Sequence, residues 1–137
     1  MIQLAAPYFE DFILRPNPLN ENKIKLEWKE KNSSEYFDAN NLSDGALRFI
    51  CLAAVLLQPN LPAAIIIDEP ELGLHPFAIN LSASLIKRIS DEKQIIIVTQ
   101  SVQLINEFSI NDYTVGGIWK KIFSEDVHKC LLILRYQ

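Results

Sequence analysis

Two adjacent carboxylates, Asp68 and Glu69, are the side chains of this sequence with the clearest capacity for chemistry. They follow three consecutive isoleucines at residues 65–67. Neighbouring carboxylates are costly to hold together unless a cation or a proton-transfer task uses them. In a nucleotide hydrolase, Asp68 would hold Mg²⁺, usually through water, and Glu69 would take a proton from the attacking water.

These carboxylates need a strand to place them. Three isoleucines in a row break the alternation of a half-exposed strand, so we expect residues 65–67 in a parallel strand covered on both faces. Residues 94–98 predict a second buried strand, which leads into Thr99 and Gln100. Because open α/β sheets bind ligands at the carboxyl ends of their strands, Asp68 and Gln100 are expected to open onto one crevice.

A candidate anion site lies upstream, where a helix is expected over residues 44–57. Ser43 suits the N-cap, Asp44 suits the first turn, and Gly45 lets a phosphate approach the backbone closely. The free N–H groups of a helix N-terminus attract anions. Arg48, one turn into the helix, could reach a phosphate or pair with a nearby carboxylate.

The remaining elements are predicted from the positions of prolines and turn residues and from the spacing of apolar residues. Residues 1–22 contain three prolines and predict an extended or looped start. Strands are expected over residues 23–31 and 36–37, joined by a turn at 32–34. Residues 76–90 predict a helix with apolar positions at Phe77, Leu81, Leu85 and Ile89. A short helix over 102–108 follows, and residues 127–136 predict a last strand or a helix.

Together these segments resemble the C-terminal half of an ABC-type ATPase head, of the group that includes SMC, RecF and the bacterial predicted AAA-family ATPases. Residues 42–45, Leu-Ser-Asp-Gly, look like the signature motif, with Asp44 where the commonest form has glycine. Residues 65–69 look like Walker B, with Glu69 at the catalytic-base position.

The next two matches follow in the order the family has them. Residues 70–76 match the D-loop region, in the Glu-Leu-Gly-Leu-His-Pro form typical of the predicted-ATPase group. Residues 99–101 fall at the switch region, where most relatives carry histidine. Gln100 can hydrogen-bond a phosphate or a water but cannot carry a proton near pH 7 as histidine can. The resemblance covers roughly residues 7–108.

The resemblance implies an α/β fold, with a mainly parallel P-loop NTPase sheet flanked by helices and preceded by a β-hairpin. It implies ATP and Mg²⁺ as cofactors, with Asp68 as the metal-binding residue and Glu69 and Gln100 as catalytic residues. In such heads the signature residues of one protomer reach the γ-phosphate held by the facing protomer. Ser43, Gly45 and Arg48 are the corresponding nucleotide-binding residues here.

One expected motif is missing from the sequence. A phosphate-cradling loop requires Gly-x-x-x-x-Gly-Lys-[Ser/Thr], and none of the four glycines stands in that pattern. The chain therefore looks like half a head that needs Walker A from an N-terminal half or a second protomer, in a homo- or heterodimer. DNA binding would be possible through the full-length protein.

Composition indicates one soluble, cytoplasmic domain. A chain of 137 residues can bury one core, and a net charge of −4 argues against autonomous nucleic-acid binding. Cys51 and Cys130 suggest reduced core residues. No stretch approaches the ~20 apolar residues of a membrane span. We expect a single domain over 1–137, divided into a loop and β-hairpin (1–40), a signature, Walker B and switch core (41–108) and a divergent tail (109–137).

Two alternatives remain open from the residues. A non-catalytic, truncated interaction module would pair its exposed sheet edge with a partner chain. A metal-dependent nuclease would use Asp68, Glu69 and His75 as ligands. Glu71 is expected to be structural or interfacial, and Trp28 and Trp119 to be core or interface aromatics. A sheet that lacks its N-terminal half leaves an edge or an apolar face uncovered, so we also expect self-association.

Overall fold

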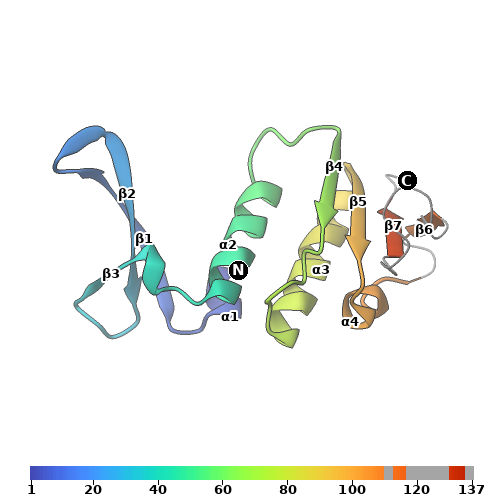
Figure 1. Cartoon of the computed structure of the whole chain (residues 1–137), viewed down its shortest axis with the longest axis horizontal. Coiled ribbons are helices and arrows are strands. Elements are labelled where there is room, and N and C mark those ends of the chain that lie inside the picture. The colour runs from blue at the N-terminus through green and yellow to red at the C-terminus, as the bar shows by residue number, and fades with distance from the viewer. Residues whose placement is uncertain (110–112, 117–129, 135–137) are drawn as a thin grey trace, which may run out of the picture.

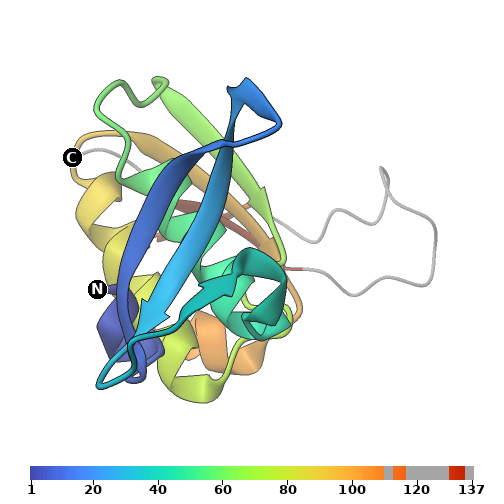
Figure 2. The same ribbon diagram turned by 90° about the vertical axis from the view of Figure 1, so that its left-hand side faces the viewer.

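The computed structural model describes residues 1–109, 113–116 and 130–134, which form two sheets with helices between them (Figure 1; Figure 2 turns the view by 90°). The first sheet has the strand order β1-β2-β3 and the second has the order β4-β5-β7-β6. Their strands are β1 (Phe9–Asn17), β2 (Asn20–Glu30), β3 (Tyr36–Asp38), β4 (Ala64–Asp68), β5 (Gln94–Thr99), β6 (Tyr113–Gly116) and β7 (Cys130–Leu134). The helices are α1 (Ile2–Ala5), the 3₁₀ turn η1 (Ala39–Asn41), α2 (Asp44–Leu56), α3 (Pro76–Ser90) and α4 (Val102–Asn106).

The two isoleucine strands are neighbours, as predicted. β4 and β5 pair in parallel, with Ile65 opposite Ile95 and Asp68 opposite Val98. β7 then pairs antiparallel with β5, and β6 pairs antiparallel with β7. Within the expected last element over 127–136, the described residues Cys130–Leu134 form strand β7, so the helical alternative is wrong there. Predictions for Trp119 and for the side chain of Cys130 fall outside the described part of the chain.

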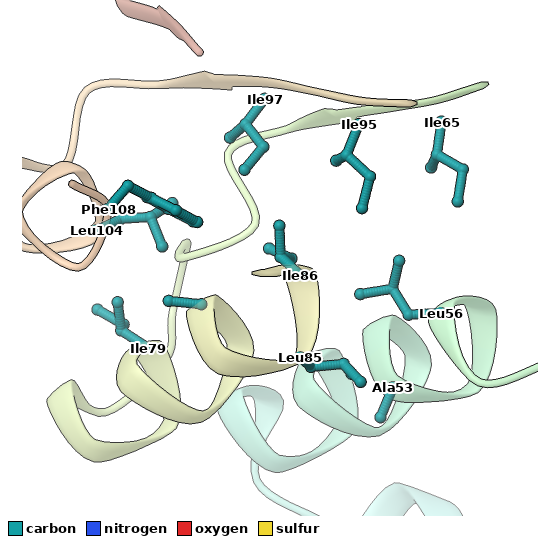
Figure 3. Packing of buried hydrophobic residues seen from close by; sticks show 11 residues of the cluster. Ala53, Leu56, Ile65, Ile79, Leu85, Ile86, Ile95, Ile97, Leu104 and Phe108 are labelled. Carbon is teal, nitrogen blue, oxygen red and sulfur yellow. The ribbon is translucent and has the colours of Figure 1, made fainter. Parts of the chain in front are cut away.

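The main core lies between the second sheet and helices α2 and α3. Figure 3 shows Ile95 and Ile97 pointing from β5 toward Leu56 of α2 and Ile86 of α3. All four of these side chains have no exposed surface. Each contributes about 1.5–3 kcal/mol relative to an exposed position, which fixes the strand ends that carry the polar residues.

The opposite face of β4 is open, so the prediction that this strand is covered on both faces is wrong. Successive side chains of a strand alternate between its faces. Ile65 is therefore buried against the helices, whereas Ile66 is 72% exposed. β4 also forms one edge of the second sheet among the described residues. The expectation that an edge or an apolar face stays uncovered is confirmed.

The N-terminal sheet is larger than expected, because β1 replaces part of the predicted loop. β1 pairs along β2, with Phe12 opposite Trp28 and Pro16 opposite Ile24. Pro16 lies in an outer strand, where a missing N–H is tolerated. The predicted β2–β3 hairpin is confirmed, and its turn contains Asn32 in the left-handed region (φ 62°).

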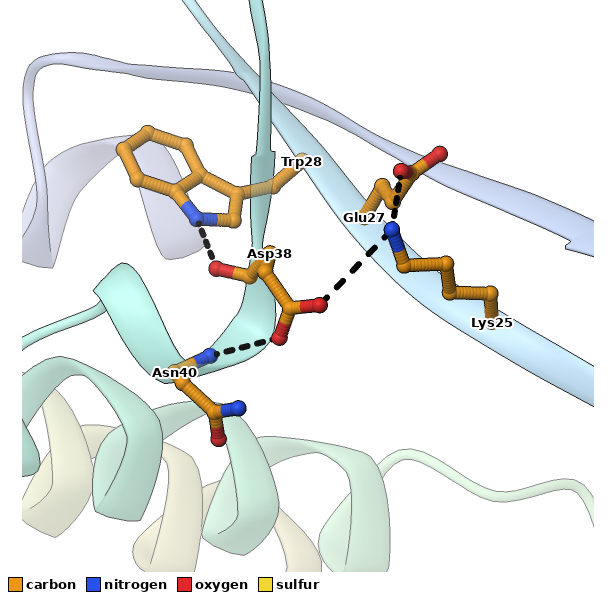
Figure 4. Close-up of polar contacts among 5 residues, drawn as sticks. All are labelled: Lys25, Glu27, Trp28, Asp38 and Asn40. Atoms are coloured by element: carbon orange, nitrogen blue, oxygen red, sulfur yellow. Dashed lines mark hydrogen bonds and ion pairs between the residues drawn. The ribbon is translucent and has the colours of Figure 1, made fainter.

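Asp38 connects this sheet to the segment that leads into α2 (Figure 4). Its backbone carbonyl accepts the indole N–H of Trp28 at 3.1 Å, and its Oδ1 accepts the backbone N–H of Asn40 at 3.1 Å. The ammonium of Lys25 lies 2.8 Å from Glu27 Oε1 and 3.8 Å from Asp38 Oδ2. Asp38 thus ends β3, caps η1 and orients the chain that enters α2.

A second cluster of buried residues ties the N-terminal sheet to α2. Trp28 is 5% exposed, which confirms it as a core aromatic. It belongs to a cluster with Ala6, Phe9, Leu42 and Ile50. Among the described residues, none of the helices is long and apolar enough to span a bilayer.

Candidate functional site

The N-terminus of α2 is capped as the sequence predicts. The backbone N–H of Ala46 donates to the Ser43 hydroxyl at 3.2 Å, and Asp44 lies in the first turn. Ser43 and Asp44 are both exposed. The cap satisfies one of the helix's free N–H groups and leaves the positive end of its dipole facing solvent.

Gly45 contacts the loop that follows β4 through backbone atoms. A Cβ on Gly45 would lie 2.5 Å from the carbonyl oxygen of Gly73. Gly73 is itself in the left-handed region (φ 74°), and the stem of Arg48 lies over it. Glycine is therefore required at position 45 by close packing. From the sequence alone, only a phosphate-facing role is predicted for Gly45.

Glu69 leaves β4 in a conformation that is unusual for a non-glycine residue (φ 48°). Such left-handed residues cost about 1–3 kcal/mol and occur often at functional sites. Its backbone N–H donates to the carbonyl of Val98 at 2.8 Å, and its Oε1 accepts the side-chain amide of Gln100 at 2.7 Å. Two carboxyl ends of parallel strands thus bring Glu69 and Gln100 into direct contact.

Asp68 is the last residue of β4 and lies at the same edge of the sheet. Its carboxylate side chain is exposed, and the residue pairs with Val98 in the parallel register. Gln100 follows two residues after Val98. Asp68 and Gln100 thus lie at one end of the sheet, as predicted, but neither lines the pocket next to Glu69, so their opening onto a shared crevice stays a prediction.

A second contact joins the same two segments and was not anticipated from the sequence. The hydroxyl of Thr99, which has no exposed surface, donates to Glu71 Oε1 at 2.5 Å. Glu71 Oε2 is buried and has no hydrogen-bond partner within the described part of the chain. Thr99 also accepts the backbone N–H of Ser101 at 3.0 Å. The available sequence signal was a polar residue at the end of an otherwise apolar buried strand.

His75 serves as a helix cap in the structure. Its Nδ1 accepts the backbone N–H of Phe77 at 3.3 Å and caps α3. Within the part of the chain that the structure describes, no group of three or more His, Cys, Asp or Glu residues could hold a metal ion. Asp68, Glu69 and His75 therefore do not form the ligand cluster that a nuclease would need.

An open pocket of about 520 Å³ connects α2 with the loop after β4. Asp44, Arg48 and Glu69 line it together with apolar side chains. Cys51 also lines it and is exposed, so its predicted burial in the core is wrong. The pocket brings Arg48 and Glu69 to one surface, whereas Ser43 and Asp68 lie outside its lining.

Comparison with known proteins places these features in a family. Residues 4–106 match the family described as "AAA domain, putative AbiEii toxin, Type IV TA system". Among curated proteins, none is significantly similar to this chain. A solved chain reported under "Structural biochemistry of ATP-driven dimerization and DNA stimulated activation of SMC ATPases" superposes with a TM-score of 0.62 at 20% identity, covering 96% of this chain and 77% of that one. The fold is that of an SMC ATPase head, and the chain belongs to this AAA domain family.

Proposed function

We propose that this chain supplies the signature, Walker B and switch residues of a composite ATP-hydrolysing site whose Walker A loop comes from another segment. The observation that carries the proposal is the contact of Glu69 with Gln100 at the carboxyl ends of two parallel strands. Ligands of open α/β sheets bind at this edge.

Glu69 is the proposed general base. It would orient a water for attack on the γ-phosphate and accept its proton. One of its oxygens accepts from Gln100, which fixes the carboxylate without neutralising it. Gln100 is the proposed switch residue. Its side-chain amide would couple the position of the Glu69 carboxylate to the position of the phosphate.

Asp68 is the proposed Mg²⁺-binding residue. Mg²⁺ typically binds proteins through one or two carboxylates plus substrate phosphates and keeps several waters, so a protein ligand cluster is not required. An exposed carboxylate at the end of β4 suits that mode. When bound with ATP, the ion would neutralise charge on the transferring phosphoryl group.

Ser43 and the first turn of α2 are proposed to serve a nucleotide held by a facing protomer. The exposed hydroxyl and the helix dipole favour a γ-phosphate at this end. Gly45 lets the backbone of α2 lie close to the loop after β4, and Arg48 on the pocket wall adds a positive charge. None of these groups recognises adenine, so the chain alone should bind polyphosphates weakly and without selectivity.

The uncovered surface next to β4 is the proposed contact for the Walker A-bearing half. Ile66 on β4 and Leu47 and Val55 on α2 are exposed apolar residues on elements that flank the site. Exposed apolar edges of this kind mark interaction sites. Dimerisation driven by ATP, as described for the SMC ATPases, would then bring two such heads together, and DNA contact would belong to the full-length protein.

The same edge favours a second candidate function. A chain that pairs β4 with a partner strand, and never contacts nucleotide, would be a non-catalytic interaction module. It would use Ile66 and the outer edge of β4, which has no further strand beside it among the described residues, while leaving Glu69 and Gln100 without a task.

The test combines this chain with a segment carrying Gly-x-x-x-x-Gly-Lys-[Ser/Thr], encoded in frame or by a neighbouring gene. The assembly should hydrolyse ATP, and Glu69→Gln should reduce turnover about 10²–10⁴-fold while preserving ATP binding. Glu92→Gln, an exposed carboxylate in the loop before β5, is the matched control and should leave turnover unchanged. Stable association without any turnover would favour the interaction module.

A further inference from the structure

We propose that Glu71 and Thr99 are positioning residues that hold the amide of Gln100 against Glu69. The inference rests on the proposed function, since it assigns a task to the Glu69–Gln100 contact. Neither residue would touch the nucleotide. Both would act by fixing the backbone on which Gln100 stands.

Two side-chain hydrogen bonds join the end of β5 to the loop after β4. Consecutive residues at the end of β5, Thr99 and Gln100, bond to alternate residues of the loop after β4, Glu71 and Glu69. Thr99 is fully buried and Gln100 is exposed, so one bond holds the loop on its buried side and the other holds it on its solvent side. We call these two bonds the double contact.

The Thr99 hydroxyl both donates and accepts a hydrogen bond. Its oxygen accepts the backbone N–H of Ser101, so its single proton is directed to Glu71. Ser101 in turn caps α4 by accepting the N–H of Leu104 at 3.2 Å. Gln100 is thus flanked on both sides by residues whose side chains are bonded, which restricts its backbone.

Glu71 is an unfavourable residue to bury. Among the described residues its buried Oε2 has no hydrogen-bond partner, and a buried polar group left unpaired destabilises the fold. Buried groups of this kind require an explanation beyond stability. Holding Thr99, and through it the position of Gln100, supplies one.

The consequence for the reaction is geometric. Glu69 is held in a left-handed conformation, and Gln100 is its side-chain amide partner. If the backbone at Thr99 shifted, the long Gln100 side chain would lose its fixed position. A misplacement near 1 Å at a reacting group can lower turnover by about 100-fold.

The experiment follows the side-chain amide signals of Gln100 by ¹⁵N NMR in the full chain. Thr99→Val, which keeps the shape and removes the hydroxyl, and Glu71→Ala should move the Gln100 signal to the position of a free amide. Thr99→Ser and Glu71→Gln retain donor and acceptor and should preserve it. Gln103 is the internal control, because its amide donates to the carbonyl of Pro76 outside the double contact.

Each result has a defined meaning. A Gln100 signal unchanged in Thr99→Val and Glu71→Ala would overturn the proposal. Loss of both the Gln100 and Gln103 signals would show general loosening of the fold and would overturn it as well. In the assembly with Walker A, Thr99→Val should lower kcat about tenfold to 100-fold with KM unchanged. A wild-type assembly without turnover would refute the proposed function, while the NMR signals still decide whether the double contact positions Gln100.

Discussion

Gly45 and Gly73 meet through backbone atoms, so closely that a single methyl group on Gly45 would lie 2.5 Å from the carbonyl oxygen of Gly73. The start of α2 and the loop after β4 are therefore in direct backbone contact. Ser43, which is proposed to serve the facing nucleotide, is thus joined to the loop that carries Glu69.

Gly45→Ala should destabilise the chain. The nearest atom is backbone, which cannot rotate away, so relief of the contact requires a shift of the loop. We expect a loss of about 1–3 kcal/mol in the free energy of unfolding, the usual cost of overpacking. Urea denaturation of the variant measures it, and Ser84→Ala on the exposed side of α3 should change stability by less than about 0.5 kcal/mol. An unchanged midpoint for Gly45→Ala would contradict the close contact.

Substitutions at Ser43 should separate capping from phosphate binding. Ser43→Ala removes the cap and should cost about 1 kcal/mol of stability, whereas Ser43→Asp restores a good cap. The added carboxylate of Ser43→Asp should nevertheless repel a phosphate, so ATP-dependent association with the Walker A half should be lost. Thermal unfolding of the chain and sedimentation with and without ATP give the two readings. Normal ATP-dependent association of Ser43→Asp would show that the γ-phosphate does not bind at this helix end.

Asp68→Ala should weaken Mg²⁺-ATP binding by the assembly. The loss of a charge-assisted contact to the hydrated ion corresponds to about 1.5–3 kcal/mol, or roughly tenfold or more in affinity. Titration of ATP at several Mg²⁺ concentrations should show that excess Mg²⁺ partly restores binding. Asp91→Ala, a remote exposed carboxylate at the end of α3, should behave as the unchanged chain. A deficit that does not depend on Mg²⁺ would argue that Asp68 has a different task.

Ile66→Lys should suppress self-association without unfolding the chain. Ile66 is 72% exposed on an edge strand, so its replacement should change stability by less than about 0.5 kcal/mol. A lysine on a strand edge discourages pairing with another strand. Sedimentation at high protein concentration measures the association, and Asn60→Lys in an exposed loop controls for the added charge. If the chain is monomeric before substitution, β4 is not an association surface.

The parts of the fold that sequence patterns predict are local. Ser43 before an apolar helix, and Pro76 at the first turn of another, mark helix starts that the structure confirms. Ile66 shows what a pattern cannot reveal, because an apolar run does not say whether another element lies over its second face. Pro16 contributed to the expectation of a loop for a related reason. A strand tolerates this proline because β1 is an outer strand, which the sequence does not reveal.

The helix over residues 76–90 shows that a real periodicity can still misplace one of its positions. A four-residue spacing advances 400° on an α-helix, so a series from Phe77 to Ile89 drifts around the axis. Phe77 is 51% exposed, but Leu85 is buried with Ile79, Ala83 and Ile86, and Ile89 packs against the same cluster. The site shows the same limit, because the contact of Glu69 with Gln100 depends on the register of strands far apart in sequence.

Helix α2 takes part in both hydrophobic clusters of the chain. Ile50 packs in the cluster of Trp28, while Ala53 and Leu56 pack in the cluster of the second sheet. A helix of 13 residues is a rod about 20 Å long. A partner that tilted the N-terminal sheet would therefore also tilt α2 relative to the second sheet. Ser43, at the N-terminus of α2, would then move relative to the phosphate that we propose it contacts.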